Sequence, residues 1–125
     1  QKNKRGFDMK KTEHQHQAAL IKWANAMTGV HPELRWLYAI PNGGQRNVVT
    51  GVKLKAEGVR AGVSDLFLPT ARHGYHGMYI EMKSEKGRTR PNQIEFMSFV
   101  EGEGYKSVVC HDWILARNEI EQYLK

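Results

Sequence analysis

Apolar residues recur at helical spacing in some stretches of the chain and at strand spacing in others. Spacings of three and four residues predict helices over 13–27, 91–101 and 113–124, with a shorter helix over 52–57. Short runs rich in β-branched and aromatic residues predict strands over 34–40, 62–68, 78–84 and 105–110. This α-β-α-β-β-α-β-α order predicts an α/β domain in which helices cover both faces of a four-stranded sheet.

Polar residues interrupt two of the helical stripes on the side that should face the core. In the first helix, the apolar stripe through Leu20 extends backward to Gln17 and Glu13. Glu13 would equally suit the positive end of the helix dipole, and Gln17 an exposed position. In the helix over 91–101, Gln93 also lies on the inward side.

Charged residues occupy two strands at positions where a buried strand favours apolar side chains. Because side chains alternate along a strand, Glu81 and Lys83 share one face of the strand over 78–84. Asp65 belongs to the neighbouring predicted strand. A Glu-x-Lys pair alone most often forms an ion pair on a solvent-facing strand. With Asp65 nearby and inward polar residues on two helices, the pattern favours a metal-dependent nuclease site.

Hydrolysis of a phosphodiester requires neutralisation of the phosphate charge and an activated, in-line water. A bound Mg²⁺ or Mn²⁺ provides both, and these cations take oxygen ligands. We expect carboxylate ligands from Asp65 and Glu81 and a third oxygen from the backbone carbonyl of Met82. Lys83 would orient or deprotonate the water, or stabilise the developing negative charge.

The chain of 125 residues has 19 Lys and Arg against 13 Asp and Glu, a net charge of +6. This surplus fits either solubility or a phosphate backbone as partner. No apolar run is long enough for a membrane span, and the polar N-terminus does not resemble a secretory signal. Together with the single cysteine, Cys110, these features predict a cytoplasmic protein. Residues 1–11 are basic and predict a flexible arm ahead of one domain over 12–125.

Basic and donor-rich residues surround the predicted site in sequence. Asn42 and Gly43 form a strong turn signal, so a hairpin is one interpretation of that loop, and phosphate binding is another. We expect these residues to contact DNA through its phosphates: Asn42, Arg46, Lys53, Lys55, Arg60, Lys86, Arg88 and Arg90. Any single one of them would also suit a solvated surface.

Several motifs occur together in a fixed order. They are Glu13-x-x-x-Gln17, Pro41-Asn42-Gly43-Gly44-x-Arg46, Leu54-Lys55-x-x-Gly58-Val59-x-x-Gly62-Val63-x-Asp65-Leu66, Ile80-Glu81-Met82-Lys83 with Gly87, Gln93, and Gly104-Tyr105. With this set, the chain resembles the PD-(D/E)xK nuclease superfamily and, within it, the stand-alone virus-type replication–repair nuclease (VRR-NUC) domain. The resemblance covers about residues 12–125.

The resemblance implies a restriction-endonuclease-like core with a central mixed four-stranded sheet. It implies a Mg²⁺- or Mn²⁺-dependent endonuclease with Asp65 and Glu81 as metal ligands, Lys83 as the catalytic lysine and Glu13 as a further acidic residue at the metal. Gln17 and Gln93 would support the site. Stand-alone members resemble Holliday junction resolvases, which implies branched DNA as substrate, a homodimer, and a role in DNA repair in a bacterial or phage-infected cell.

The chain departs from the family pattern at two positions. Ser64 replaces the usual Pro before the Asp, and Arg90 stands where a Ser or Thr often precedes the Pro. Neither change removes a ligand, so we expect activity to survive.

Four other interpretations of the sequence compete with this one. The six histidines lack the spacing of a zinc site, and no nucleophile elbow for Ser/His/Asp catalysis is present. A non-catalytic junction-binding module on the same fold would be favoured if a ligand were missing. A restriction-type endonuclease would need a recognition insertion, for which 125 residues leave little room.

Overall fold

The computed structural model describes residues 10–42 and 48–125. Four strands form one sheet in the order β1-β2-β3-β4: Tyr38–Ala39, Leu66–Leu68, Met78–Met82 and Lys106–Cys110. β1 pairs with β2 and β2 with β3 in antiparallel register, whereas β3 and β4 are parallel. The sheet is therefore mixed, as expected.

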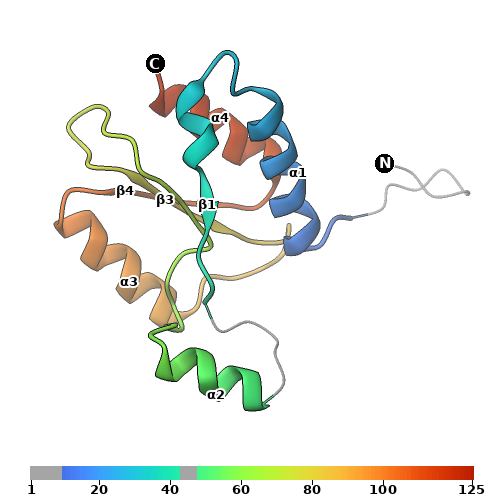
Figure 1. The fold of residues 1–125 in the computed structure, drawn as a ribbon, viewed down its shortest axis with the longest axis vertical. Coiled ribbons are helices and arrows are strands. Elements are labelled where there is room, and N and C mark those ends of the chain that lie inside the picture. The colour runs from blue at the N-terminus through green and yellow to red at the C-terminus, as the bar shows by residue number, and fades with distance from the viewer. Residues whose placement is uncertain (1–9, 43–47) are drawn as a thin grey trace, which may run out of the picture.

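Helices cover the sheet from both sides (Figure 1). α1 (Glu13–Ala26) and α4 (Trp113–Tyr123) pack against each other and against β3 on one face, while α3 (Pro91–Gly102) lies against β4 on the other. α2 (Val48–Ala56) contacts no other helix or strand in the described parts of the chain and stands below the sheet in Figure 1. None of the described helices is long and apolar enough to span a membrane.

The hydrophobic core lies between the sheet and the α1–α4 pair. Its fully buried side chains come from α1, from alternate positions of the central strands and from α4, and include Leu20, Leu66, Ile80, Met82 and Ile120. Because Ile80 and Met82 face this core, the intervening Glu81 points to the α3 side of the sheet. The strand that anchors the core thus also positions the charged residues.

The start of α1 is fixed by a capping box. The backbone N–H of Gln15 donates to Thr12 Oγ1 at 3.1 Å, and the backbone N–H of Thr12 donates to Gln15 Oε1 at 2.9 Å. Glu13 is the first residue of this helix, so its position at the sheet end is set by the cap.

Three elements depart most from their expected bounds, while the others differ from them by one or two residues. The first three residues of the predicted strand over 34–40 belong to a 3-10 helix, η1 (Pro32–Trp36), because Pro32 presets a helical φ at its first turn; only Tyr38 and Ala39 pair as a strand. The short helix begins at Val48 rather than residue 52, and the chain passes through it before β2, so β1 and β2 form no tight hairpin. β2 begins at Leu66, one residue after Asp65.

Candidate active site

A polar cavity of about 230 Å³ opens beside the end of β3. The start of α1, the segment before β2, the end of β3 and the first turn of α3 contribute its walls. Its lining residues are Glu13, Asn42, Ala61, Gly62, Asp65, Glu81, Lys83, Arg90, Asn92 and Gln93. At about 30 Å³ per water molecule, this volume accommodates a hydrated cation and a phosphate oxygen.

Asp65 is held in one orientation by hydrogen bonds to both of its carboxylate oxygens. Asn42 Nδ2 donates to Oδ1 at 2.8 Å, and the backbone N–H of Met82 donates to Oδ2 at 2.7 Å. Asn42 also donates to the carbonyl of Val63 at 3.3 Å, so the segment after β1 is joined to the segment just before β2. These hydrogen bonds hold the Asp65 carboxylate against the end of β3.

Glu81 is almost fully buried, with 1% of its surface exposed. Its Oε2 accepts a hydrogen bond from Gln93 Nε2 at 3.2 Å and lies 3.8 Å from Lys83 Nζ. Its Oε1 is buried and has no hydrogen-bond partner among the described residues. A buried carboxylate oxygen without a donor is costly, so this atom marks a position for a missing positive partner.

The electrostatics of the cavity disfavour a second negative charge. Burial is the largest cause that raises the pKa of Glu81 from 4.5 to about 8, followed by the negative charge and close approach of the Asp65 carboxyl and, last, by the charge of Glu13; the charge of Lys83 lowers this pKa. In the absence of a cation, a proton on Glu81 relieves the repulsion between the two carboxylates. A divalent cation would relieve the same repulsion in its place.

Lys83 lies just past β3 and is 4% exposed. Its backbone N–H donates to the carbonyl of Cys110 at 2.9 Å, which continues the β3–β4 pairing by one residue. The buried ion pair with Glu81 shows that these two side chains do not lie on a solvent-facing strand. The amino group is thus held inside the cavity.

The donor set fits a hard divalent cation with few protein ligands. The described residues contain no group of three or more His, Cys, Asp or Glu side chains arranged to hold a metal. Mg²⁺ often takes only one or two carboxylates and keeps several waters. Asp65 and Glu81 meet that need, while Glu13 is an exposed residue on the cavity wall; Met82 is not among the lining residues, so its carbonyl stays a predicted ligand.

The two supporting glutamines occupy different places. Gln93 accepts a hydrogen bond from the backbone N–H of Arg90 at 2.8 Å through Oε1 and donates to Glu81 through Nε2. It therefore links the first turn of α3 to the buried carboxylate. Gln17 is half-buried and lines a separate cavity along α1 with residues that include His14 and Ile21.

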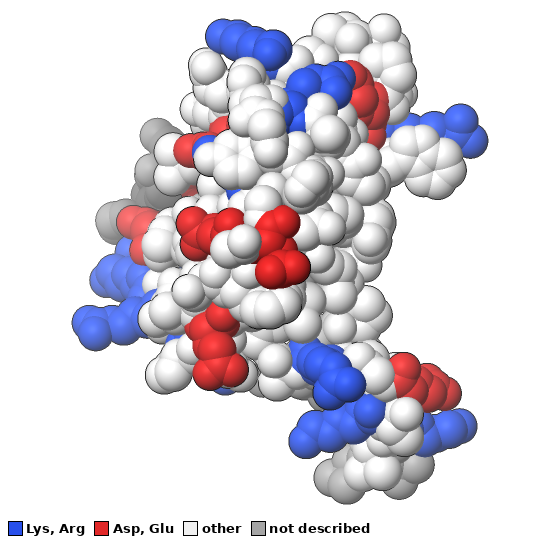
Figure 2. All heavy atoms as spheres, turned by 90° about the vertical axis from the view of Figure 1, so that its left-hand side faces the viewer, with Lys and Arg blue, Asp and Glu red and all other residues white. Residues whose placement is uncertain are grey.

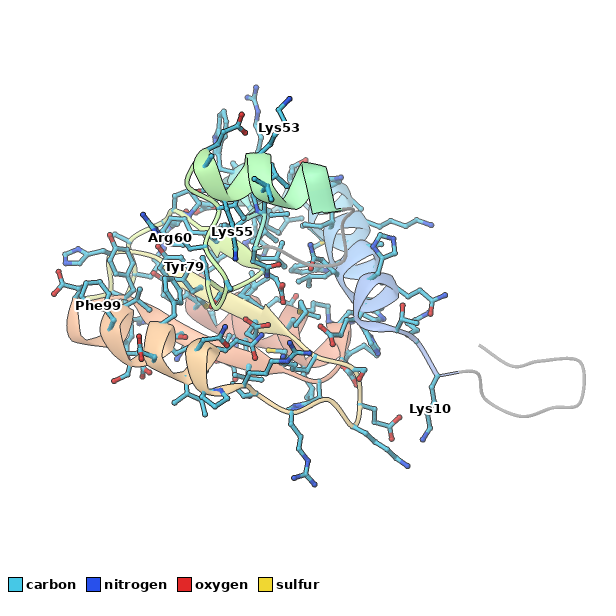
Figure 3. All side chains as sticks on the ribbon, turned by 90° about the horizontal axis from the view of Figure 1, so that it is seen from below. Lys10, Lys53, Lys55, Arg60, Tyr79 and Phe99 are labelled. Atoms are coloured by element: carbon cyan, nitrogen blue, oxygen red, sulfur yellow. The ribbon has the colours of Figure 1, made fainter. Side chains whose placement is uncertain are left out.

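Most of the predicted DNA-contacting residues are exposed. They are Lys53, Lys55, Arg60, Lys86, Arg88 and Arg90, whereas Asn42 is half-buried against Asp65; Arg46 lies outside the described residues, as does most of the 1–11 arm. Figure 3 shows Lys53 and Lys55 on opposite sides of α2. In Figure 2, acidic side chains gather in the middle of the face shown and basic side chains near its lower end, at the height of α2. Arg90 alone of the exposed group also lines the cavity.

Three positioning contacts had no clear signal in the sequence. Gly62 has φ +93°, and a Cβ atom there would lie 2.8 Å from the backbone oxygen of Asn92, so this glycine lets the pre-β2 segment pack on the start of α3. His111 Nε2 lies 3.0 Å from the carbonyl of Gly87 and ties the loop that follows Lys83 to the end of β4. Asn42 positions Asp65 as well as lining the cavity. Asn42 and Gly62 belong to the motifs quoted above, but the spacing of those motifs does not predict these contacts.

A sheet that ends in two carboxylates and a lysine, with a helix-borne Glu at the rim, defines the class of restriction-endonuclease-like nuclease folds. The VRR-NUC domain profile matches residues 11–113, and the chain belongs to this family of nuclease domains. A solved structure described as a VRR_NUC domain protein superposes with a TM-score of 0.76 at 26% sequence identity, covering 94% of this chain and 91% of that one. No curated protein sequence matches the chain.

Proposed function

We propose that this protein is a Mg²⁺- or Mn²⁺-dependent, structure-selective DNA endonuclease that hydrolyses phosphodiester bonds in branched DNA such as Holliday junctions. The observation that carries the proposal is the buried Oε1 of Glu81, which has no hydrogen-bond partner among the described residues and lies in one cavity with Asp65 and Lys83. Membership in a nuclease-domain family supports it.

The residues divide the chemistry between them. Asp65, Glu81 and the Met82 carbonyl would hold the cation, and Glu13 would add negative charge at the rim. A bound cation would neutralise the scissile phosphate and acidify a water. Lys83, which is buried and paired with Glu81, would orient that water or stabilise charge on the phosphate. Gln93 would keep Glu81 in position.

We infer that two groups of basic side chains would contact the DNA backbone. Lys86, Arg88 and Arg90 lie on the segment between Lys83 and α3, and Lys53, Lys55 and Arg60 lie on or just after α2. We infer that phosphates on either side of the scissile bond contact these two groups. Such contacts position the nuclease and carry no sequence information.

We also propose that the protein acts as a cytoplasmic homodimer. Two identical sites related by a two-fold axis would cut opposite strands of a junction symmetrically. Light scattering at working concentration should give twice the mass of 14.4 kDa; a monomeric mass would contradict the dimer.

A cleavage panel tests the proposed function directly. The substrates are a four-way junction, a flap, a splayed arm, a duplex and a single strand, each with Mn²⁺, with Mg²⁺ or with EDTA. We expect cutting of the branched substrates with either cation and none with EDTA. Binding without cutting under every condition would favour a junction-binding module, and cutting of duplex at one sequence would favour a restriction-type enzyme.

A further inference from the structure

A row of aromatic side chains crosses the sheet on the same side as the cavity. Tyr38 on β1 pairs with Phe67 on β2, which pairs with Tyr79 on β3. Their ring centroids are 5.9 Å apart for Tyr38 and Phe67 and 4.4 Å apart for Phe67 and Tyr79. We call these three residues the aromatic row.

The aromatic row lies directly beside the candidate catalytic residues. On β3, Tyr79 and Glu81 are two residues apart and face the same side, a separation of about 7 Å along the strand. Phe67 likewise follows Asp65 by two residues. Consecutive nucleotides of an extended strand are separated by a similar distance, so a phosphate at Asp65 and Glu81 would place an adjoining base over the row.

One end of the row is open. Tyr38 is 50% exposed, and Phe67 and Tyr79 are half-buried. α3 covers the other end, where Phe96 meets Tyr79 edge-on at 5.2 Å. The described residues therefore leave ring surface accessible from the β1 side.

The tyrosine hydroxyls give this surface a polar edge. Burial and, after it, the neighbouring phenols of Tyr105 and Tyr38 raise the pKa of Tyr79, and the rings of Tyr79 and Tyr105 meet edge-on with centroids 5.5 Å apart. Rings with a polar edge suit a planar group that has both a π-face and hydrogen-bonding atoms. A nucleobase is such a group.

We propose that the aromatic row binds an unpaired DNA base adjoining the phosphate in the cavity. Aromatic stacking accepts any base, and basic side chains nearby would hold the backbone. Lys55 on α2 and Arg60 just after it would provide that charge; in the view of Figure 3 both project between α2 and the labelled Tyr79. The location relative to the scissile phosphate rests on the proposed function, while the base-binding surface itself does not.

The test uses DNA containing 2-aminopurine, whose fluorescence falls when it stacks on an aromatic ring. A duplex with a one-nucleotide unpaired 2-aminopurine is titrated in EDTA with wild type, Tyr38→Ala, Tyr38→Leu and Tyr38→Phe. Phe99→Ala is the matched control, because Phe99 is an exposed ring, 66% accessible, outside the row on α3 (Figure 3). Fully paired duplex is titrated in parallel.

We expect wild type, Tyr38→Phe and Phe99→Ala to quench the fluorescence equally. Tyr38→Ala and Tyr38→Leu should lose the quenching and bind the unpaired DNA about 5- to 100-fold more weakly, with duplex affinity unchanged. Retained quenching and affinity in Tyr38→Ala, or an equal loss on duplex, would overturn the inference.

The titration is independent of cleavage because EDTA removes the cation. If wild type fails to cut in the cleavage panel but Tyr38→Ala loses the unpaired base, the proposed function fails and the base site stands. If wild type cuts junctions but Tyr38→Ala still binds the base, the base site fails and the proposed function stands.

Discussion

Glu81 is the residue on which the electrostatics of the cavity depend. Its carboxyl is buried between Asp65, Lys83 and Gln93, with one oxygen that lacks a donor among the described residues. The same burial that would make it a strong cation ligand makes its charge costly in the cation-free protein. Stability and function therefore oppose each other at this side chain.

This opposition predicts a specific dependence of stability on pH. The pKa of Glu81 is raised from 4.5 to about 8, so the folded state binds more protons than the unfolded state between these values. The free energy of unfolding should therefore fall as pH rises through this window and level off above it. Glu81→Gln should remove that fall and raise the melting temperature at about pH 9 but not at about pH 4.

Thermal melts of the cation-free protein check this prediction. Glu101→Gln, an exposed residue of α3, is the control and should keep the pH dependence of the wild type. Parallel curves for wild type and Glu81→Gln across the window would show that Glu81 is not the titrating group.

At the scale of elements, the start of α3 carries both a helix cap and a side of the cavity. Gln93 accepts from the backbone N–H of Arg90 and donates to Glu81. Gln93→Glu retains the acceptor for Arg90 but replaces the donor with negative charge beside Glu81. We expect this variant to lose most cleavage activity, whereas Gln93→Ala should lose activity and also about 1 kcal/mol of stability with the cap.

Cleavage rates and thermal melts of the two Gln93 variants separate these roles. The control is Ser98→Ala, an exposed position on the same helix outside the cavity, which should keep the activity of the wild type. Full activity in Gln93→Glu would show that its donor toward Glu81 is dispensable.

The contact of Gly62 with α3 gives a second prediction at this scale. Ala at position 62 would need a left-handed φ and would press its Cβ against Asn92, so Gly62→Ala should destabilise the fold by about 2 kcal/mol or more. Gly51 in α2 has open space around its Cα, and Gly51→Ala should instead stabilise by about 0.5–1 kcal/mol. Denaturant melts measure both, and equal effects would contradict the packing argument.

The sequence predicted the helices and the central strands because their apolar spacing matches the faces that they bury. Leu20 and Ala24 face the core at helical spacing, and Ile80 and Met82 do so at strand spacing. The sequence predicted a strand from residue 34, but the chain forms a 3-10 helix up to Trp36, because the backbone preference of Pro32 outweighs the apolar run.

The sequence predicted which residues form the candidate site, but not the contacts that hold them in place. Asp65, Glu81, Lys83 and Gln93 line one cavity as expected, because strand alternation and helix periodicity specify the faces. The pairing of Asn42 with Asp65 joins residues far apart in the chain, and no spacing rule encodes it. The backbone of Lys83 is likewise tied to the distant end of β4, through its N–H donating to the carbonyl of Cys110.

At the scale of the whole molecule, we expect the proposed binding to DNA to weaken with salt, as the net charge of +6 would favour contacts with phosphates. If Lys86 and Arg88 each contact a phosphate, the double variant Lys86→Ala/Arg88→Ala should reduce the slope of log affinity against log salt by about 1.8. Lys125→Ala, at the exposed C-terminal residue, should leave the slope unchanged. An unaltered slope in the double variant would place the DNA elsewhere; anisotropy titrations at several salt concentrations provide the measurement.

The central claim is that Asp65, Glu81 and Lys83 form a hydrolytic centre. Its most direct test is the single-turnover rate of branched-DNA cleavage in Mn²⁺ for wild type, Lys83→Ala and Glu81→Gln, with Lys125→Ala as control and DNA affinity measured in EDTA. We predict that the two cavity variants bind DNA as wild type does but cut at least about 100-fold more slowly, while Lys125→Ala cuts normally. Cleavage by Lys83→Ala and Glu81→Gln at the wild-type rate would contradict the account.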